Sequence, residues 1–411
     1  MGKDIDPDTH RDKHLNPAIA VFRSKARAKI AIHDLYNVIG DSRLRWTLLF
    51  TGLMLMCSAG TAAASMQQVF TAFNELYTTE LHSTTRCQEG AVNQYRVCAE
   101  SLRNEGNGPF ILHHGKPTKN VAVLFHGLSD SPYFMRALAA VLHDRGFTVV
   151  VPLLPGHGLR QADAAMEDSQ LAERWQQHVE DIMALSQPLG ERFFVGGFST
   201  GGALAVDHYL DAPEDIAGLM LFSGALTLTD NAETMHKIWG IKTLAKLIDG
   251  EYETHGPNPY KYPAVAGFAG LELMDVIRSI RTRLEEGQRI KVPVFAAHSQ
   301  ADNTTPIKGV KRLLEFADGT NTFFEIDKEY DLCHADLPLN RKLVADMHFK
   351  TNMVNAQERC AVPKANPLYR QMIFMLEAFV SAHTEITPGL QDSNRPRPYI
   401  SYDDFKQATG K

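Results

Sequence analysis

Short runs of apolar residues recur through the middle and the second half of the chain. Each run is continuous rather than alternating, which is typical of strands that helices cover on both faces of a parallel sheet. The runs lie at 121–125, 147–151, 192–196, 216–224, 292–297 and 322–326, and a shorter one at 109–112 precedes them. We therefore expect a buried sheet built from these segments.

Segments with helical periodicity separate the apolar runs. We expect helices at 132–142, at 171–185 and from Thr200 onward, and a last helix at 367–383. Strands that alternate with helices in this way predict an α/β fold with a doubly wound, mostly parallel sheet. Nearer the amino terminus, the apolar residues of 66–81 share one helical face, which favours a helix packed on the domain over a membrane helix.

Residues 229–291 interrupt the alternation after the sixth strand. This insertion is apolar and aromatic, and two helical stretches are expected in it, near 232–248 and 271–284. An apolar insertion at the carboxyl ends of parallel strands predicts a cap over a binding site. A packed extra layer without a substrate role is the alternative. The core of the domain then consists of 65–228 and 292–383.

The first 64 residues differ from the rest of the chain. Residues 1–45 are polar and carry both charge signs, which predicts a mostly disordered extension. Residues 46–64 hold no charge, follow two arginines and end in small residues, which predicts a cleaved secretory signal or, alternatively, a retained membrane anchor. Because this segment lies far from Met1, we hypothesise that translation begins near Val38. Residues 384–411 are expected to form a tail.

Composition and charge limit the function. The chain of 411 residues is 44% hydrophobic and 22% charged, which suits one large α/β domain with additions. A net charge of −6 without a clustered basic stripe argues against a nucleic-acid partner. The sequence has no C-x-x-C or H-E-x-x-H motif, so we expect no zinc site, and the chemistry predicted below needs neither a metal nor a cofactor.

Four cysteines remain once the segment 46–64 is removed. An even number in an exported protein permits disulfides, and proximity in the sequence favours Cys87–Cys98 and Cys333–Cys360. Four buried free thiols are the alternative. We expect a periplasmic or secreted protein, or one anchored in a membrane with its folded domain outside the cytoplasm.

The pentad Gly197-Phe198-Ser199-Thr200-Gly201 lies between an apolar run and a helical pattern. A sharp turn at this place would expose the serine oxygen, and such a turn needs glycine two residues before and two residues after the serine. We therefore predict that Ser199 is a nucleophile. Thr200 opens the helix, so its free N–H is expected to face the oxygen of the group that Ser199 attacks.

A His-Gly loop, His126-Gly127-Leu128, follows the first long strand. If this loop turns sharply, the Leu128 N–H points at the same place as the Thr200 N–H, and the two donors form an oxyanion hole. His126 is not expected to be the base, because it precedes the nucleophile and belongs to this loop. A second loop, Pro-Gly-His-Gly at 155–158, is expected to be structural or to line the rim of a pocket.

Two later strand ends supply the remaining partners. Asp302 follows the strand at 292–297, where a carboxylate can accept the Nδ1–H of a catalytic histidine. A helix N-cap is the alternative role for this aspartate. His334 follows the last strand and completes the order Ser199, Asp302, His334 that is typical of nucleophile-elbow hydrolases. The other histidines precede the acid or lie in helical or polar stretches, so we favour His334 as the base.

This ordered set of motifs resembles the α/β-hydrolase superfamily, and within it the branch of monoacylglycerol lipases, bacterial carboxylesterases and serine aminopeptidase-like proteins. The motifs that carry the likeness are His126-Gly127-Leu128, Pro155-Gly156-His157-Gly158, Gly197-Phe198-Ser199-Thr200-Gly201, Asp302 with Pro306, and His334. The likeness covers 120–383. Two regions depart from it, a segment at 341–366 between the histidine and the last helix, and the long amino-terminal region.

The resemblance implies an esterase or lipase with the site just described. Ser199 would be the nucleophile, His334 the base and Asp302 the orienting acid. Leu128 and Thr200 would be the oxyanion donors, and the cap would shape the pocket. No cofactor is implied.

We predict hydrolysis of carboxylic esters through an acyl-enzyme on Ser199. A peptidase or amidase of the serine aminopeptidase-like type is one alternative, which the acidic residues Asp249, Glu251 and Glu253 of the insertion keep open. A non-catalytic binding protein of the same fold is another. The expected partner is a small-molecule or lipid ester, with membrane association through 46–64 as an option, and the sequence leaves the oligomeric state open.

Overall fold

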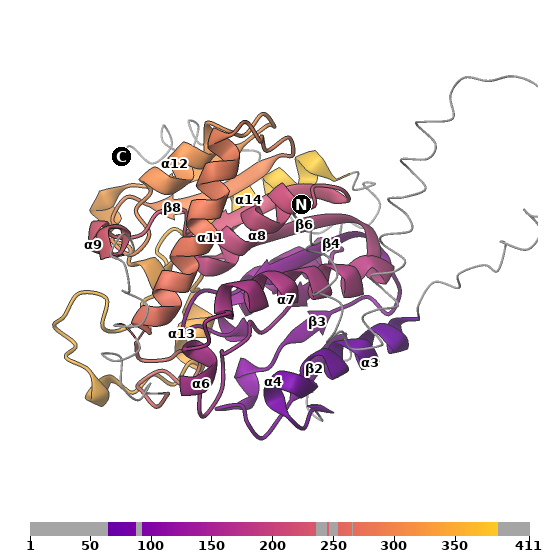
Figure 1. Ribbon diagram of the computed structural model, residues 1–411, viewed down its shortest axis with the longest axis horizontal. Helices are drawn as coiled ribbons and strands as arrows, with labels where there is room; N and C mark the ends of the chain where they lie inside the picture. The colour runs from indigo at the N-terminus through magenta and orange to yellow at the C-terminus, as the bar shows by residue number, and fades with distance from the viewer. Residues whose placement is uncertain (1–64, 88–92, 236–244, 246–253, 265, 385–411) are drawn as a thin grey trace, which may run out of the picture.

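The computed structural model describes residues 65–87, 93–235, 245, 254–264 and 266–384 (Figure 1). The predicted extension, the signal or anchor segment and almost all of the predicted tail lie outside these residues. Within them, no helix is both long and apolar enough to cross a membrane.

In the described part of the chain, nine strands form one sheet in the order β1-β2-β3-β5-β4-β6-β7-β8-β9. The strands from β5 to β9 in this order run parallel, and β1, β2 and β3 join them antiparallel. This confirms the predicted doubly wound, mostly parallel sheet. The strands are β1 (Thr85–Arg86), β2 (Gln94–Cys98), β3 (Phe110–Leu112), β4 (Thr118–Phe125), β5 (Thr148–Val151), β6 (Gly190–Phe198), β7 (Ile216–Phe222), β8 (Val294–Ser299) and β9 (Thr322–Ile326).

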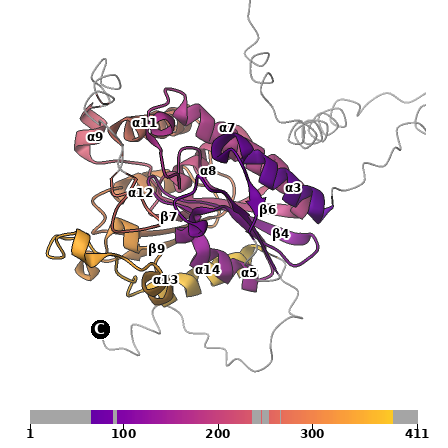
Figure 2. The ribbon, with the colours of Figure 1, turned by 90° about the horizontal axis from the view of Figure 1, so that it is seen from below.

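Helices flank the sheet on both faces, as Figures 1 and 2 show. The α-helices are α3 (Met66–Leu76), α4 (Thr78–Leu81), α5 (Arg136–Asp144), α6 (Asp163–Met166), α7 (Leu171–Ser186), α8 (Thr200–Asp211), α9 (Asp230–Met235), α11 (Gly267–Glu285), α12 (Lys308–Leu314), α13 (Arg341–Asp346) and α14 (Tyr369–His383). The 3₁₀ turns are η3 (Glu105–Asn107), η4 (Pro132–Met135), η5 (Gln187–Leu189), η6 (Lys328–Tyr330), η7 (His334–Asp336) and η8 (Thr351–Met353).

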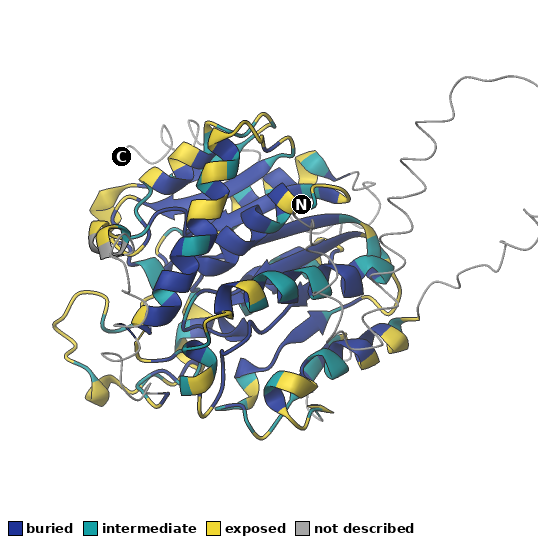
Figure 3. Ribbon diagram, in the orientation of Figure 1, coloured by how far each residue is buried: buried dark blue, intermediate teal, exposed yellow. Residues whose placement is uncertain are grey.

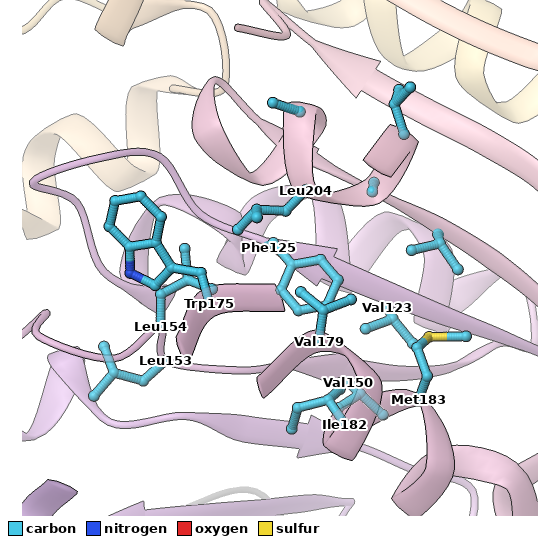
Figure 4. Packing of buried hydrophobic residues seen from close by; sticks show 14 of the residues in the cluster. Val123, Phe125, Val150, Leu153, Leu154, Trp175, Val179, Ile182, Met183 and Leu204 are labelled. Atoms are coloured by element: carbon cyan, nitrogen blue, oxygen red, sulfur yellow. The ribbon is translucent and has the colours of Figure 1, made fainter. Parts of the chain in front are cut away.

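Side chains of the continuous apolar strands pack into two separate hydrophobic cores. Val123 of β4 packs in the cluster beneath α7 and α8, whereas its neighbour Leu124 packs in the cluster with α5 and α14. Alternation of side chains along a strand explains why such a strand must be apolar at every position. Figure 3 shows the resulting band of buried strands, and Figure 4 shows the first cluster, where Phe125 lies near Trp175, Val179 and Leu204.

The amino-terminal helix packs on the domain, as predicted. Helix α3 lies against α7, and its residues Val69 and Phe73 are fully buried. Tyr77, which follows α3, is also buried, and its hydroxyl accepts a hydrogen bond of 3.1 Å from the Leu153 N–H.

The insertion differs in part from the predicted cap at 229–291. It follows β7, the seventh strand of the described sheet in chain order, whereas the prediction placed it after the sixth. Helix α11 packs against α8 and α7, and so belongs to the layer that covers one face of the sheet. Its apolar residues Leu273, Ile277 and Ile280 are buried there. Of the insertion before α11, the structure describes residues 229–235, 245, 254–264 and 266. A cap role for this part of the insertion stays a prediction.

Both predicted disulfides are present. Cys87 pairs with Cys98, and Cys333 pairs with Cys360. Disulfides persist in oxidising compartments, so this finding favours a location outside the cytoplasm.

Candidate active site

Ser199 occupies the turn between β6 and α8. Its backbone has φ 53° and ψ −116°, a conformation that costs a non-glycine residue energy and is found where function requires it. The turn lifts Ser199 off the end of the strand, although the residue stays largely buried at 6% exposure. This is the geometry that the pentad predicts for a nucleophile.

His334 lies at the start of η7, beyond the carboxyl end of β9. Its Nε2 is 2.9 Å from the Ser199 Oγ, and its ring packs 4.7 Å from the ring of Phe198. The side chain is 12% exposed, so solvent reaches only its edge. Ser199 and His334 therefore already have the spacing that proton transfer requires.

Asp302 accepts a hydrogen bond of 2.6 Å from the Nδ1 of His334 through its Oδ2. Its Oδ1 accepts the N–H groups of Thr304 and Thr305 at 2.9 and 3.0 Å. Burial alone would raise the pKa of this carboxyl, but the neighbouring His334 and the hydrogen bonds outweigh it and lower the pKa to about 2. The carboxylate thus caps the turn after β8 and holds the histidine at the same time.

Two neighbours of this carboxylate, Thr305 and His298, were not predicted from the sequence. The Thr305 hydroxyl lies 3.1 Å from both the Asp302 Oδ2 and the His334 Nδ1. His298 is fully buried, and its Nε2 lies 2.7 Å from the Thr305 carbonyl oxygen. Thr305 precedes Pro306 in a polar turn, and this position was the only signal that could have identified it.

The two predicted oxyanion donors lie at the same edge of the sheet. Thr200 is the first residue of α8, where an N–H has no acceptor within the helix. Leu128 belongs to the loop after β4. Strands β4 and β6 are paired in parallel up to Phe125 and Gly197, so the loop with Leu128 and the turn with Thr200 begin side by side. The positions agree with the prediction, and the role of Leu128 and Thr200 stays a proposal.

His126 joins two loops and is not placed as a base. Its Nδ1–H donates to the Gly127 carbonyl oxygen at 2.9 Å, and its Nε2 accepts the Leu154 N–H at 3.0 Å. Burial, followed by the charge of nearby His157, lowers its pKa well below the usual value, so the ring stays neutral. Both ring nitrogens are therefore occupied in holding the loop after β4 against the loop after β5.

The loop at 155–158 is anchored by hydrogen bonds that suit a structural role. The Trp175 Nε1–H donates to the Pro155 carbonyl oxygen at 3.1 Å. The Tyr262 hydroxyl donates to the Gly156 carbonyl oxygen at 3.1 Å and accepts the Leu159 N–H at 2.7 Å. Tyr262 comes from the insertion, so the insertion and this loop are tied together.

The described part of the insertion also contacts the loop that holds Leu128. The Tyr262 N–H donates to the Ser129 carbonyl oxygen at 2.8 Å, and the Ser131 hydroxyl donates to the Tyr260 carbonyl oxygen at 2.8 Å. Lys261 forms an ion pair of 2.5 Å with Asp130. The described part of the insertion thus packs against the loop that contains Leu128, and its role as a cap stays a prediction.

Among the described residues, no group of three or more histidine, cysteine, aspartate and glutamate side chains is arranged to hold a metal ion. The acidic residues Asp249, Glu251 and Glu253, which would favour an amine substrate, lie outside the described residues.

Comparisons with known proteins agree with this fold. Residues 116–261 match the family described as serine aminopeptidase, S33. A thermostable monoacylglycerol lipase from Bacillus sp. (strain H-257) is 25% identical over 201 residues, which are 49% of this chain and 76% of that protein.

Solved structures give further likenesses at lower identity. A structure from work on the metagenome-derived lipolytic enzymes LipS and LipT is similar with a TM-score of 0.48 at 20% identity, over 66% of this chain and 97% of that one. The monoacylglycerol lipase of Paleococcus ferrophilus is similar with a TM-score of 0.46 at 19% identity, over 67% of this chain and 99% of that one. The family match and the relative above support an α/β-hydrolase of the monoacylglycerol lipase and serine aminopeptidase-like branch.

Proposed function

We propose that this protein is a serine hydrolase that cleaves carboxylic esters through an acyl-enzyme on Ser199. One observation carries the proposal: the imidazole of His334 lies within hydrogen-bond distance of both the Ser199 hydroxyl, at 2.9 Å, and the Asp302 carboxylate, at 2.6 Å. A nucleophile, a base and an orienting acid linked in this way are the parts of a Ser-His-Asp triad.

The first half of the reaction acylates the enzyme. Ser199 Oγ attacks the ester carbonyl carbon while the His334 Nε2 removes the hydroxyl proton. Asp302, which keeps its charge because its pKa is low, stabilises the imidazolium and holds the Nδ1–H tautomer. Collapse of the tetrahedral intermediate expels the alcohol, which receives its proton from His334.

The second half releases the acid. Water takes the place of the alcohol, His334 removes its proton, and the acyl group leaves Ser199 as the carboxylic acid. In both halves the carbonyl oxygen becomes negative, and the N–H groups of Leu128 and Thr200 would stabilise that charge. Each such donor contributes about 3 kcal/mol to the transition state in enzymes of this kind.

Ester substrates are favoured because the relative that is 25% identical over 201 residues is named a monoacylglycerol lipase. An aminopeptidase remains the second candidate, since the family that matches 116–261 is described as serine aminopeptidase. The triad serves both reactions, so the substrate must be decided by experiment.

A fluorophosphonate probe and a substrate panel test the proposal. We expect the probe to label the wild-type protein, and Ser199→Ala to remove both the labelling and the hydrolysis of p-nitrophenyl esters. Hydrolysis of aminoacyl amides at a higher kcat/KM than esters would favour the peptidase. Labelling that persists in Ser199→Ala, or a wild-type protein that is never labelled, would contradict a serine hydrolase at this site and support a binding protein.

A further inference from the structure

The chain turns back on the active site after the histidine. Between α13 and α14 it extends away from the sheet, at the lower left of Figure 1, and residues 359–366 then return along the loops that hold Asp302 and His334. The returning segment supplies none of the three triad residues, but it contacts the loops that hold two of them.

Arg359 bridges the two loops. Its Nε–H donates to the Asp331 carboxylate at 2.8 Å, three residues before His334. Its Nη2–H donates to the Ala301 carbonyl oxygen at 3.0 Å, immediately before Asp302. One guanidinium group therefore holds the backbone next to the acid and the loop that presents the base.

The next residue adds a covalent link to the same loop. Cys360 is bonded to Cys333, the residue directly before His334. Further along, the Lys364 N–H donates to the buried carboxylate of Asp336 at 3.0 Å, two residues after the histidine. The backbone on both sides of His334 is thus tied to the returning segment.

These ties matter because the acid and the base come from different strands. Asp302 follows β8 and His334 follows β9, and the strand ends are joined by the Gln300 N–H, which donates to the Ile326 carbonyl oxygen at 2.9 Å. His334, however, lies eight residues beyond the end of β9, which leaves room for its loop to shift. Small displacements of a catalytic group lower rates strongly.

We propose that Arg359 and the Cys333–Cys360 disulfide are positioning elements that hold His334 against Asp302 and Ser199 during turnover. This inference rests on the proposed serine hydrolase function. Arg359 touches no reacting atom, so it acts only through the two loops. An arginine suits this role because its planar fork donates in two directions at once, whereas a lysine offers one point charge.

The contribution of Arg359 should appear in kinetics rather than in stability. Its side chain is 40% exposed and that of Asp331 is 69% exposed, and ion pairs so exposed contribute little to folding. A purely structural role would instead show itself as a lower melting temperature, with kcat unchanged in the folded protein. A positioning role lowers kcat while KM changes little, because substrate binding does not depend on the imidazole.

Arg359→Gln tests the bridge, with Arg289→Gln as the matched control. Arg289 also donates its Nε–H to one carboxylate, that of Asp318, and is 38% exposed, but it precedes β8 at the opposite end of the sheet. We expect Arg359→Gln to lower kcat for a p-nitrophenyl ester by about tenfold with KM within about twofold. Arg289→Gln should match the wild type, and Arg359→Lys should recover only part of the loss.

The Cys333–Cys360 disulfide allows a second test of the positioning role. Cys333→Ser with Cys360→Ser should lower kcat, and Cys87→Ser with Cys98→Ser should leave the kcat of the folded protein unchanged, because that pair joins β1 and β2 at the far edge of the sheet. Circular dichroism and thermal unfolding show whether each variant is folded at the assay temperature. Should the first double variant not fold, Arg359→Gln alone decides the question.

Wild-type labelling by the fluorophosphonate probe separates the two hypotheses. If the wild-type protein is not labelled, the proposed function fails and this inference fails with it. If it is labelled, an unchanged kcat in folded Arg359→Gln overturns the positioning role alone. Full activity of Arg359→Lys would also overturn the bridge, because a single charge would then suffice.

Discussion

Gly197 and Gly201 lie against the same atom, the backbone carbonyl oxygen of Phe125. A Cβ added at Gly197 would lie 2.2 Å from that oxygen, and one added at Gly201 would lie 2.1 Å from it. Real atoms do not approach so closely, and both obstacles are backbone rather than a movable side chain. The turn that holds Ser199 can therefore lie against β4 only if both positions are glycine.

We predict that Gly201→Ala damages both folding and activity. The added methyl group must push the Phe125 carbonyl away, and Phe125 leads directly into the loop with Leu128. Overpacking of this kind costs about 1–3 kcal/mol, and here a moved backbone would also displace the proposed oxyanion donor Leu128. The free energy of unfolding, measured by chemical denaturation, should be lower than in the wild type. The kcat measured on the folded fraction should be lower as well.

Gly270→Ala provides the control for that prediction. Gly270 lies in α11, and an added Cβ there meets no atom within 4 Å. Alanine is favoured over glycine inside a helix, so this variant should be more stable by about 0.5–1 kcal/mol with unchanged activity. Equal stability losses in the two variants would mean that the contact with Phe125 is not the cause.

The pattern of the chain predicted the elements whose surroundings are the same along their whole length. Central strands such as β4 are buried on both faces, so they are apolar throughout and easily recognised. The strand β1 was missed because Thr85 and Arg86 are exposed and pair only at the sheet edge. Helix α11 was recognised as a helix but assigned to a cap, since an amphipathic stripe does not reveal which surface will cover it.

The site was predicted in part for a similar reason. Ser199, Asp302 and His334 each follow a strand, so their place at one edge of the sheet follows from the order of elements, and the structure brings the three together. Arg359 could not be found this way. It lies beyond α13, and only the fold of the segment after that helix returns it to the loops that it bridges.

Asp302→Asn should abolish most of the activity without unfolding the protein. Its Oδ1 can still accept the N–H groups of Thr304 and Thr305, which leaves the new amide N–H₂ facing the His334 Nδ1. The His334 Nδ1 must then accept a hydrogen bond from this amide, so the imidazole proton moves to Nε2. A protonated Nε2 cannot remove the Ser199 proton. A change of this kind lowers kcat by about 10⁴-fold in a Ser-His-Asp triad.

Steady-state kinetics with circular dichroism check the loss. Asp318→Asn is the matched control, because it makes the same substitution in an exposed carboxylate paired with Arg289. We expect its kcat to equal that of the wild type. A decrease of less than about tenfold in Asp302→Asn would show that this carboxylate does not select the tautomer.

Lys261 neutralises a buried carboxylate beside the predicted oxyanion loop. Asp130 is 1% exposed, its Oδ1 pairs with the Lys261 Nζ at 2.5 Å, and its Oδ2 has no hydrogen-bond partner among the described residues. Lys261→Met would leave this charge unpaired, at a cost of about 2–3 kcal/mol, because Lys261 is only partly buried. An uncompensated negative charge near the oxyanion should lower kcat as well.

A double-mutant cycle tests this pairing. Asp130→Asn removes the charge that Lys261→Met leaves behind, so the double variant should be more stable than Lys261→Met alone. Lys342→Met is the control, since Lys342 forms an exposed ion pair with Asp346 on α13 and should change stability by less than about 0.5 kcal/mol. Strictly additive free energies of unfolding in the cycle would exclude coupling between Lys261 and Asp130.

Buried neutral histidines should make the fold sensitive to acid. Burial, and after it the charge of Arg174, lowers the pKa of His178 to about 3, and burial lowers the pKa of His157 to about 4. Below the unfolded value of 6.5 the unfolded chain binds protons that the folded protein does not, so stability falls as the pH falls. Each such group lowers the free energy of unfolding by up to about 1.4 kcal/mol per pH unit.

One carboxyl acts in the opposite direction. Burial raises the pKa of Asp336 to about 6, so the folded protein binds this proton before the unfolded chain does, and stability rises as the pH falls from 6 toward 4. The wild-type slope therefore combines opposing groups, and a comparison of variants is needed to isolate one of them.

His178→Gln isolates the contribution of one histidine. Its Nε2 lies 3.4 Å from the Tyr77 hydroxyl, a contact that the glutamine amide can replace without a titrating group. Chemical denaturation at pH 7, 6 and 5 should show a free energy of unfolding that falls less steeply with acid than in the wild type, by up to about 1.4 kcal/mol per pH unit below 6.5. His255→Gln, at an exposed position, should keep the wild-type slope. If His178→Gln also keeps it, then this imidazole binds a proton equally well in the folded and unfolded chains, and acid sensitivity must come from other groups.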